Sequence, residues 1–212
     1  KQAVERYYCD LDNAVEKGWY FDRQAAERVI NFVEKLKHVK GKWAGQYLHL
    51  EPWQCFILWQ IFGWKMADGT RRFTEVYVEV ARKNGKSTLA SAVALYMEFA
   101  DKEMGAEVYS VATTRDQARI CFDYAQQMVR VSDLRDFAVV TRDAIVFERL
   151  GATYKPLSSE GKTLDGKHSH CVICDEYHAH PTDEVYDVMQ TSMGARQQPL
   201  MFIITTAGLN TS

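Results

Sequence analysis

The chain has 212 residues, a mass of 24.4 kDa, a formal net charge of −2 and a pI near 6.3. Its composition, 47% hydrophobic and 25% charged with only 4 prolines and 12 glycines, excludes a disordered, fibrous or collagen-like protein. No apolar run reaches the roughly 18 residues of a membrane-spanning helix, so we expect no membrane contact. The near-neutral charge confines any contact with nucleic acid to a local patch. The five scattered cysteines predict free thiols, and the abrupt ends predict a piece of a longer protein.

The first third of the chain is predicted to be helical. An N-cap aspartate and apolar residues at helical spacing predict a helix over residues 22–36. A proline suited to the first helical turn predicts another helix over residues 52–66. We expect residues 1–49 to form an N-terminal helical extension and residues 50–212 to form the core. The basic run at 35–42 is expected to be a solvated helix end, with a contact to DNA or to a partner subunit as the alternative.

From residue 75 onward, predicted strands and helices alternate. Segment 75–81 places valines on one face and mostly glutamate and tyrosine on the other, as a half-buried strand does. Further strands are predicted at 107–112, 137–140, 144–147, 152–157, 170–174 and 200–205, and helices at 87–103, 114–130 and 182–193. This alternation predicts an α/β fold with a mostly parallel sheet sandwiched by helices. The short strands between residues 137 and 157 predict a hairpin region.

A candidate phosphate-binding loop follows the first of these strands. Arg82-Lys83-Asn84-Gly85-Lys86-Ser87-Thr88 lies between a strand and a helix, which is the context of a Walker A loop. Loop amides and a helix N-terminus bind phosphate oxygens, Lys86 would contact the β- and γ-phosphates of ATP, and Ser87 would bind Mg²⁺. Val80 stands where the consensus has its first glycine, so the loop is a variant. The similar tripeptide at 161–163 has the flanks of a loop, and we favour the first site.

Two adjacent acids end the predicted strand at 170–174. Asp175 and Glu176 would lie at the carboxyl edge of a parallel sheet, where nucleotide sites form. Asp175 is expected to hold Mg²⁺, and Glu176 to orient and deprotonate the attacking water. Two solvated acids at a strand end are the alternative. A zinc site containing Cys171 and Cys174 is disfavoured, because residues three apart in a strand face opposite ways; the nearby histidines are expected to be solvated or to cap helices.

Hydroxyl side chains end the last predicted strand. The strand at 200–205 is apolar until Thr205, and the chain continues Thr206-Ala207-Gly208. Hydroxyls beside the γ-phosphate position would sense hydrolysis and pass the change on. A merely polar strand terminus is the alternative.

Taken in order, these elements resemble the ATPase domain of the large terminase subunit, the motor that packages DNA into tailed phage capsids. The loop at 82–87 is similar to the variant Walker A of the HK97-like branch, and Asp175-Glu176 matches its Walker B and catalytic acid. Thr205-Thr206-Ala207 resembles its coupling motif. Pro52-Trp53-Gln54 resembles an adenine-recognising Q-motif, in which Gln54 would read the base edge. The resemblance spans about residue 50 to 208.

The resemblance implies a RecA-like ASCE fold and a cycle of Mg-ATP hydrolysis. It implies a homomeric ring, expected to be a pentamer, that docks on the portal protein of a procapsid in the host cytoplasm and pumps double-stranded DNA. The small terminase subunit is a further implied partner, and a C-terminal RNase H-like nuclease domain is expected to lie outside this chain. Arg82 matches the arginine that activates hydrolysis from within the Walker A loop. Arg142 and Arg149 are open candidates for an arginine donated to a neighbouring subunit.

Two other functions stay open from the sequence. Asp175-Glu176-Tyr177-His178 also spells the DExH box of superfamily 2 helicases, although this chain carries no second RecA-like lobe. A nucleotide-gated binding module, which would change shape without turnover, is the non-enzymatic alternative. Glu176 is the sequence feature against that module, because a simple binder needs no catalytic acid.

Overall fold

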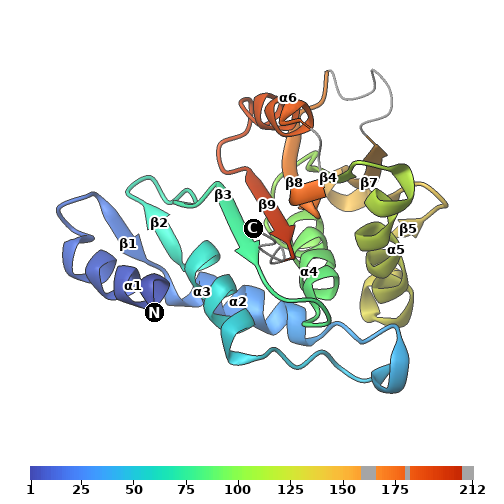
Figure 1. The fold of residues 1–212 in the computed structure, drawn as a ribbon, viewed down its shortest axis with the longest axis horizontal. Coiled ribbons are helices and arrows are strands. Elements are labelled where there is room, and N and C mark those ends of the chain that lie inside the picture. Colours follow the sequence, from blue (N-terminus) through green and yellow to red (C-terminus); the bar gives the residue numbers. More distant parts are fainter. Residues whose placement is uncertain (159–165, 180–181, 207–212) are drawn as a thin grey trace, which may run out of the picture.

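A seven-stranded sheet crosses the part of the chain that this computed structural model describes, residues 1–158, 166–179 and 182–206 (Figure 1). Its strands are, in spatial order, β3 (Glu75–Glu79), β9 (Leu200–Thr205), β8 (Ser169–Asp175), β4 (Glu107–Ala112), β7 (Ala152–Ser158), β6 (Ile145–Phe147) and β5 (Val139–Val140). The first five strands are parallel, and β7, β6 and β5 pair antiparallel. The predicted mostly parallel sheet with a hairpin region is therefore confirmed.

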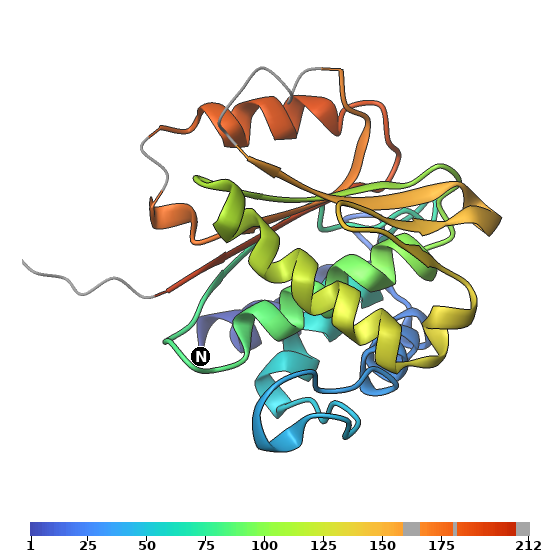
Figure 2. The same cartoon turned by 90° about the vertical axis from the view of Figure 1, so that its right-hand side faces the viewer.

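Helices cover both faces of the sheet (Figure 2). The helix α6 (Glu184–Ser192) covers one face, and the other carries α2 (Arg23–Glu34), α3 (Pro52–Gly63), α4 (Lys86–Phe99) and α5 (Arg115–Val131). Alternate side chains of β8 serve the two layers, as the pleat of a strand requires. Cys171 and Ile173 pack in the large core beneath α4 and α5, whereas Val172 and Cys174 pack against α6. The two cysteines thus belong to different layers, as predicted.

The N-terminal segment contains a strand as well as helices. After α1 (Gln2–Asn13), the strand β1 (Trp19–Phe21) pairs antiparallel with β2 (Trp64–Met66). The predicted helix at 52–66 is therefore wrong at its end, because its last three residues are extended to form this pair. The pairing joins the segment 1–49 to the following residues, and the boundary at residue 49 stays a prediction.

Local signals predicted the start of helices better than their ends. Asp22 caps α2 as expected, since its Oδ1 accepts a hydrogen bond from the Ala25 N–H at 2.9 Å. The helix α4 ends at Phe99 and not near residue 103, and the connection to β4 contains two residues with positive φ, Lys102 and Gly105.

All five cysteines are free thiols. No described helix combines the length and the apolar character needed to cross a membrane.

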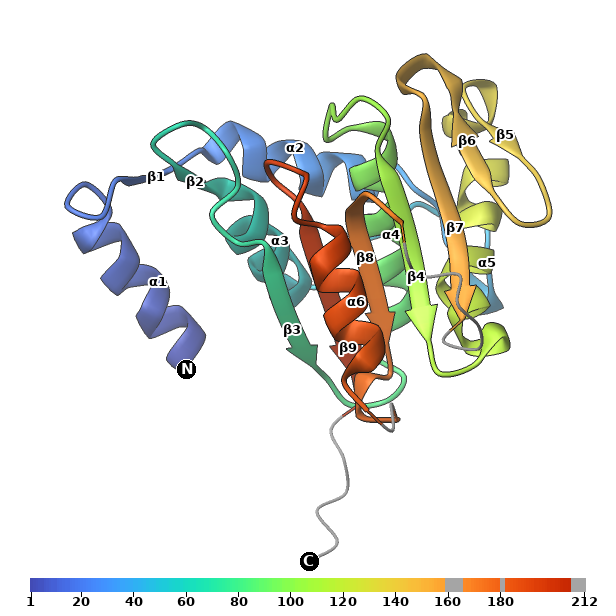
Figure 3. The same ribbon diagram turned by 90° about the horizontal axis from the view of Figure 1, so that it is seen from above.

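The parallel strands bring their carboxyl ends to one edge of the sheet (Figure 3). The candidate phosphate loop follows β3, the acids Asp175 and Glu176 end β8, and Thr205 and Thr206 end β9. Because β9 lies between β3 and β8, its end lies between the loop and the acids. Three segments that are far apart in the sequence are thereby brought to one place.

Candidate active site

The loop between β3 and α4 turns sharply at Lys83 and Gly85. Both residues have positive φ, 68° and 73°, and Gly85 is the N-cap of α4. Glycine adopts this backbone freely, whereas a lysine there costs about 1–3 kcal/mol and must be held by its surroundings. The Asn84 side chain braces the turn by donating a hydrogen bond from Nδ2 to the Ala81 carbonyl at 3.0 Å. The bend directs the loop into the N-terminus of α4, where backbone amides favour an anion.

Positive side chains gather at this turn. Lys86 is 9% exposed, and Ser87 and Thr88 follow it in the first turn of α4, where the amides have no intrahelical acceptor. Arg82 and Lys83 are exposed on the loop. Among the described residues, the Arg82 guanidinium has no hydrogen-bond or ion-pair partner. The loop therefore presents both cations and amides, which is the combination that binds a polyphosphate.

Lys86, Thr206 and Glu176 form a chain of contacts across the sheet edge. Lys86 Nζ donates to Thr206 Oγ1 at 2.7 Å, and that hydroxyl lies 2.7 Å from Glu176 Oε2, to which it donates. Lys86 Nζ also lies 3.5 Å from Glu176 Oε1. The predicted loop lysine, the predicted catalytic acid and one of the predicted threonines therefore meet, with the end of β9 as the link.

The two adjacent acids have different surroundings. Burial raises the pKa of Asp175, and the neighbouring charge of Glu176 raises it further. Burial also acts to raise the pKa of Glu176, but the Thr206 hydrogen bond and the nearby charges of Lys86 and His178 hold that pKa below its ordinary value. Glu176 is consequently ionised at neutral pH and able to accept a proton. Its φ of 50° is a strained backbone for a non-glycine residue, of the kind found at functional sites.

His178 lies at the site, and its side chain is exposed, as predicted for the histidines near the acids. The prediction is wrong for His170, which is buried with its Nε2 2.8 Å from Asp101 Oδ2. The Nδ1 of His178 lies 2.6 Å from Thr205 Oγ1 and 3.3 Å from Glu176 Oε2. The short 3₁₀ turn Tyr177–Ala179 folds the chain back after β8 and brings the ring to the acid two residues before it. The sequence signal was its place in Asp-Glu-Tyr-His, which by itself pointed to the helicase alternative. Thr205 faces this histidine, whereas Thr206 faces Lys86.

A cleft of about 490 Å³ opens beside these groups. The loop and the start of α4 form one wall, and Glu176 and His178 lie at the sheet edge. The other wall belongs to α5, which contributes Gln117 and Tyr124. Neither of these two residues was predicted as a site residue: Gln117 lies in the segment 112–118, which resembles the segment after the second strand in the terminase family, and Tyr124 lies in no motif. The packing of α5 beside α4 brings both to the loop.

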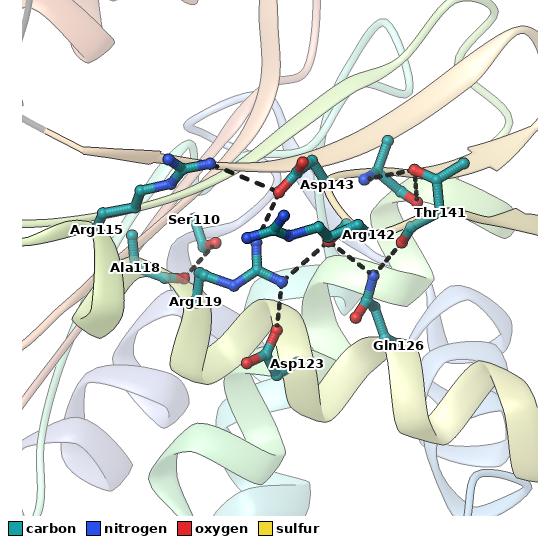
Figure 4. A network of polar contacts seen from close by, with 10 residues as sticks. Ser110, Arg115, Ala118, Arg119, Asp123, Gln126, Thr141, Arg142 and Asp143 are labelled. Atoms are coloured by element: carbon teal, nitrogen blue, oxygen red, sulfur yellow. Dashed lines mark hydrogen bonds and ion pairs between the residues drawn. The ribbon is translucent and has the colours of Figure 1, made fainter.

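A polar network fixes α5 against the turn between β5 and β6 (Figure 4). Arg119 donates to Asp143 Oδ1 at 2.9 Å and to the Arg142 carbonyl at 2.9 Å. Gln126 Nε2 donates to the carbonyls of Thr141 and Arg142. These bonds hold the backbone of Arg142 while its side chain is exposed. The helix that forms the far wall of the cleft is therefore anchored from outside the cleft.

Gln54 lies against the back of the phosphate loop. Its Oε1 accepts a hydrogen bond from the Glu51 N–H at 3.0 Å, as part of a capping box at the start of α3. A Cβ on Gly85 would lie 3.6 Å from Gln54 Nε2, so the side chain contacts the loop at its turn. Its predicted role as reader of a base edge stays a prediction.

Some predicted features lie outside the described residues, and others stay untested. The Gly-Lys-Thr tripeptide at 161–163, His180, and Ala207 with Gly208 lie in the parts of the chain that are not described. Arg142 and Arg149 are both exposed, and neither lines the cleft. Their assignment to a neighbouring subunit stays a prediction.

Comparison with known proteins identifies the family. Residues 52–212 match the family described as "Terminase large subunit, ATPase domain". The chain belongs to this family. Over 191 residues, it is 30% identical to the large terminase subunit of Enterobacteria phage HK97, covering 87% of this chain and 37% of that protein. A stretch of 46 residues, 22% of this chain and 10% of the relative, is 61% identical to protein YmfN of Escherichia coli (strain K12).

Solved terminase structures share the fold. The crystal structure of the HK97 bacteriophage large terminase aligns with a TM-score of 0.72 at 29% identity, over 85% of this chain and 37% of that chain. The ATPase domain of the Thermus phage P74-26 large terminase aligns with a TM-score of 0.51 at 23% identity, over 64% of this chain and 61% of that chain, which supports the fold alone. The predicted HK97-like terminase ATPase is therefore confirmed over the superfamily 2 alternative. This chain spans 37% of the length of the HK97 protein.

Proposed function

We propose that this domain hydrolyses Mg-ATP to drive double-stranded DNA into a procapsid. The observation that carries the proposal is the contact chain from Lys86 through Thr206 to Glu176, which joins a phosphate-binding cation to an ionised carboxylate. Membership of a family of ATPase domains supports the nucleotide as ATP. The geometry supports specific roles for the residues around that chain.

The phosphates of ATP would bind at the loop. The amides between Gly85 and Thr88 would donate to phosphate oxygens at the positive end of α4. Lys86 would contact the β- and γ-phosphates, with Lys83 adding charge at the open side of the cleft. Asn84 would act by bracing the loop, since its amide is bonded to the Ala81 carbonyl.

The donor set at this edge fits Mg²⁺. Ser87 supplies a hydroxyl and Asp175 a buried carboxylate, and Mg²⁺ typically takes one or two carboxylates together with substrate phosphates. A cation beside Asp175 would offset the cost of a charge that burial disfavours. Within the described parts of the chain, no three His, Cys, Asp or Glu side chains are grouped to hold a metal by themselves. When bound, the ion would neutralise charge on the phosphates.

Glu176 would act as the general base for the attacking water. It is ionised, it is held by Thr206, and it lies at the end of the cleft beside the phosphate loop. Arg82, which lines the same cleft, would stabilise negative charge on the transferred phosphoryl group. Thr206, directly after β9, contacts Glu176, and Thr205 at the end of β9 is linked to Glu176 through His178, so we assign both the sensing of the γ-phosphate. Gln54 would read the base edge with its side-chain amide nitrogen.

The wider machinery is part of the same proposal. We infer a homo-oligomeric ring, a pentamer on the portal protein, which acts with the small terminase subunit and moves double-stranded DNA. Its place would be the host cytoplasm, docked on the procapsid during packaging. These inferences rest on membership of the family. This chain spans 37% of the HK97 large terminase, so the machinery of the whole protein is proposed and not observed.

Steady-state ATP hydrolysis against protein concentration tests the proposal, with Glu176→Gln as the blank. We expect the variant to bind ATP like the wild type and to hydrolyse it about 10²–10⁴ times more slowly. Equal turnover in wild type and variant would refute the role of Glu176. Specific activity that rises steeply with concentration supports a site completed by a neighbouring subunit, whereas a flat rate contradicts the ring.

A further inference from the structure

The wall of the cleft opposite the phosphate loop is made by one face of α5. Gln117, Cys121 and Tyr124 are spaced by four and three residues, which places them on the same side of a helix. Cys121 is buried against Asp175, whereas Gln117 and Tyr124 line the cleft on either side of it. The face therefore begins near the catalytic acids and continues toward the far part of the cleft.

Tyr124 is the one residue in the described lining of this cleft that offers a phenol ring. The other lining residues are the small, polar or charged side chains of the loop and of α4, Gln117, Glu176, and the imidazole of His178. That imidazole is already engaged by Thr205 and Glu176. If the phosphates occupy the loop, the base and ribose must extend along the rest of the cleft. A base seeks an aromatic face there, because every base has a π-face of its own.

We propose that Tyr124 is the stacking platform for the nucleobase. The inference rests on the proposed function, since the loop must first fix the phosphates. The ring is half-buried on a helix that the Arg119 and Gln126 contacts anchor, so it is pre-positioned and loses little freedom on binding. This assignment adds a face-on contact that Gln54, an amide at the back of the loop, does not supply.

A lysine contact on the ring is compatible with this role. Lys40 Nζ lies 4.3 Å from the centroid of the Tyr124 ring, on an exposed residue of the segment between α2 and α3. An exposed cation–π contact changes an equilibrium about two- to fivefold, whereas base stacking changes it about five- to 150-fold. A base therefore displaces the ammonium from the ring if both seek the same face.

Calorimetric titration with two ligands tests the proposal. Mg-ATP reports on the whole nucleotide, and inorganic tripolyphosphate with Mg²⁺ reports on the phosphate end alone. We expect Tyr124→Ala to weaken Mg-ATP about tenfold or more and to leave tripolyphosphate within about twofold of wild type. Tyr124→Phe should keep the wild-type affinity for both ligands, because stacking uses the ring and not the hydroxyl. Tyr20→Ala removes an exposed tyrosine from β1 and is the matched control.

Each other result has a definite meaning. An unchanged Mg-ATP affinity in Tyr124→Ala, or an equal loss for both ligands, overturns the stacking role. If Tyr124→Phe loses as much Mg-ATP affinity as Tyr124→Ala, the effect comes from the hydroxyl, and the stacking role is also overturned. Tyr124→Leu, which keeps apolar volume without a π-face, replaces the alanine variant if that variant fails to fold. If Lys86→Ala binds both ligands like the wild type, the phosphate loop assignment fails and this inference falls with it.

Discussion

Thr206 is the residue on which the geometry of the site depends most. Its hydroxyl contacts the Lys86 ammonium and both oxygens of Glu176, and it is 7% exposed. Valine has nearly the same shape and no hydroxyl, so Thr206→Val removes the contact with little change in packing. A hydrogen bond to a charged group is worth about 1.5–3 kcal/mol, which corresponds to a loss of roughly ten- to 150-fold if it acts in the transition state.

We therefore expect Thr206→Val to bind ATP within a few-fold of wild type and to hydrolyse it roughly ten to 150 times more slowly. Glu176 must be ionised to accept a proton, so the rate falls as the pH drops through its pKa. The Thr206 hydrogen bond lowers that pKa, and removing it raises the pKa. The acidic limb of the pH–rate profile should consequently move to higher pH.

The variant Thr206→Ser, which keeps a hydroxyl at this position, is the control for this prediction. Serine can make the same two contacts, so the acidic limb should return toward its wild-type position. An acidic limb that stays in place in Thr206→Val, with the rate reduced, would show that Thr206 acts on something other than the proton affinity of Glu176.

At the scale of elements, β1 packs so closely on the end of α3 that only glycine fits at position 63. Gly63 ends α3, and a Cβ there would lie 2.4 Å from the Phe21 ring. Phe21 cannot give way easily, because its ring packs at 5.1 Å from Trp59 and 5.3 Å from Trp64. The two-stranded sheet of β1 and β2 can therefore pack this closely on the end of α3 only because residue 63 has no side chain.

We expect Gly63→Ala to lower the free energy of unfolding by about 1–3 kcal/mol, which is the usual cost of overpacking. Urea unfolding gives the change from the midpoint and slope. The same substitution in a Phe21→Leu background should cost less, since leucine leaves room for the methyl group. Equal costs in both backgrounds would mean that the ring is not the obstacle.

The elements that sequence predicts well are those whose signal is local. The alternation of valines in 75–79 and the N-cap at Asp22 need no knowledge of the rest of the chain. The strands β1 and β2 carry no such signal, because three residues are too few for a period and their partner lies far away in sequence. Trp64–Met66 follows an apolar helix without interruption, and it is extended because it pairs with Trp19–Phe21 and bonds to residues 70–72.

The residues of the candidate site also differ in whether a local sequence signal marks them. Lys86, Asp175 and Glu176 are marked by motifs, and their meeting follows from the rule that parallel strands end at one edge. Tyr124 lies in no motif, and the Asp-Glu-Tyr-His sequence that contains His178 pointed to the helicase alternative. Their positions depend on how α5 packs beside α4 and on how the chain turns after β8, which are properties of the assembled fold.

At the scale of the whole molecule, a bound nucleotide should stabilise the fold as a unit. A ligand at a hundred times its dissociation constant stabilises the native state by about 2.7 kcal/mol. For a chain of this size, that corresponds to a rise in Tm of about 5–10 °C. We expect this rise for the wild type with Mg-ATP, measured by thermal unfolding at several nucleotide concentrations.

Lys86→Ala should lose the rise at the same concentrations, because the lysine at the phosphate end is gone. Lys17→Ala removes an exposed lysine from the turn before β1 and should keep it. A full rise in Lys86→Ala would place the nucleotide elsewhere on the molecule.

The position of β9 in the sheet also has a consequence for how the protein is made. Glu75 in β3 pairs with Met201 in β9, and β9 in turn pairs with β8 on its other side. A ribosome that has not yet released residues 200–206 has therefore produced β3 and β8 with facing open edges and nothing between them. Thr206 directly follows that strand, so β3 joins the rest of the sheet, and Thr206 meets Lys86 and Glu176, in the same late step. The exposed edges of β3 and β8 make the interval before that step vulnerable to aggregation.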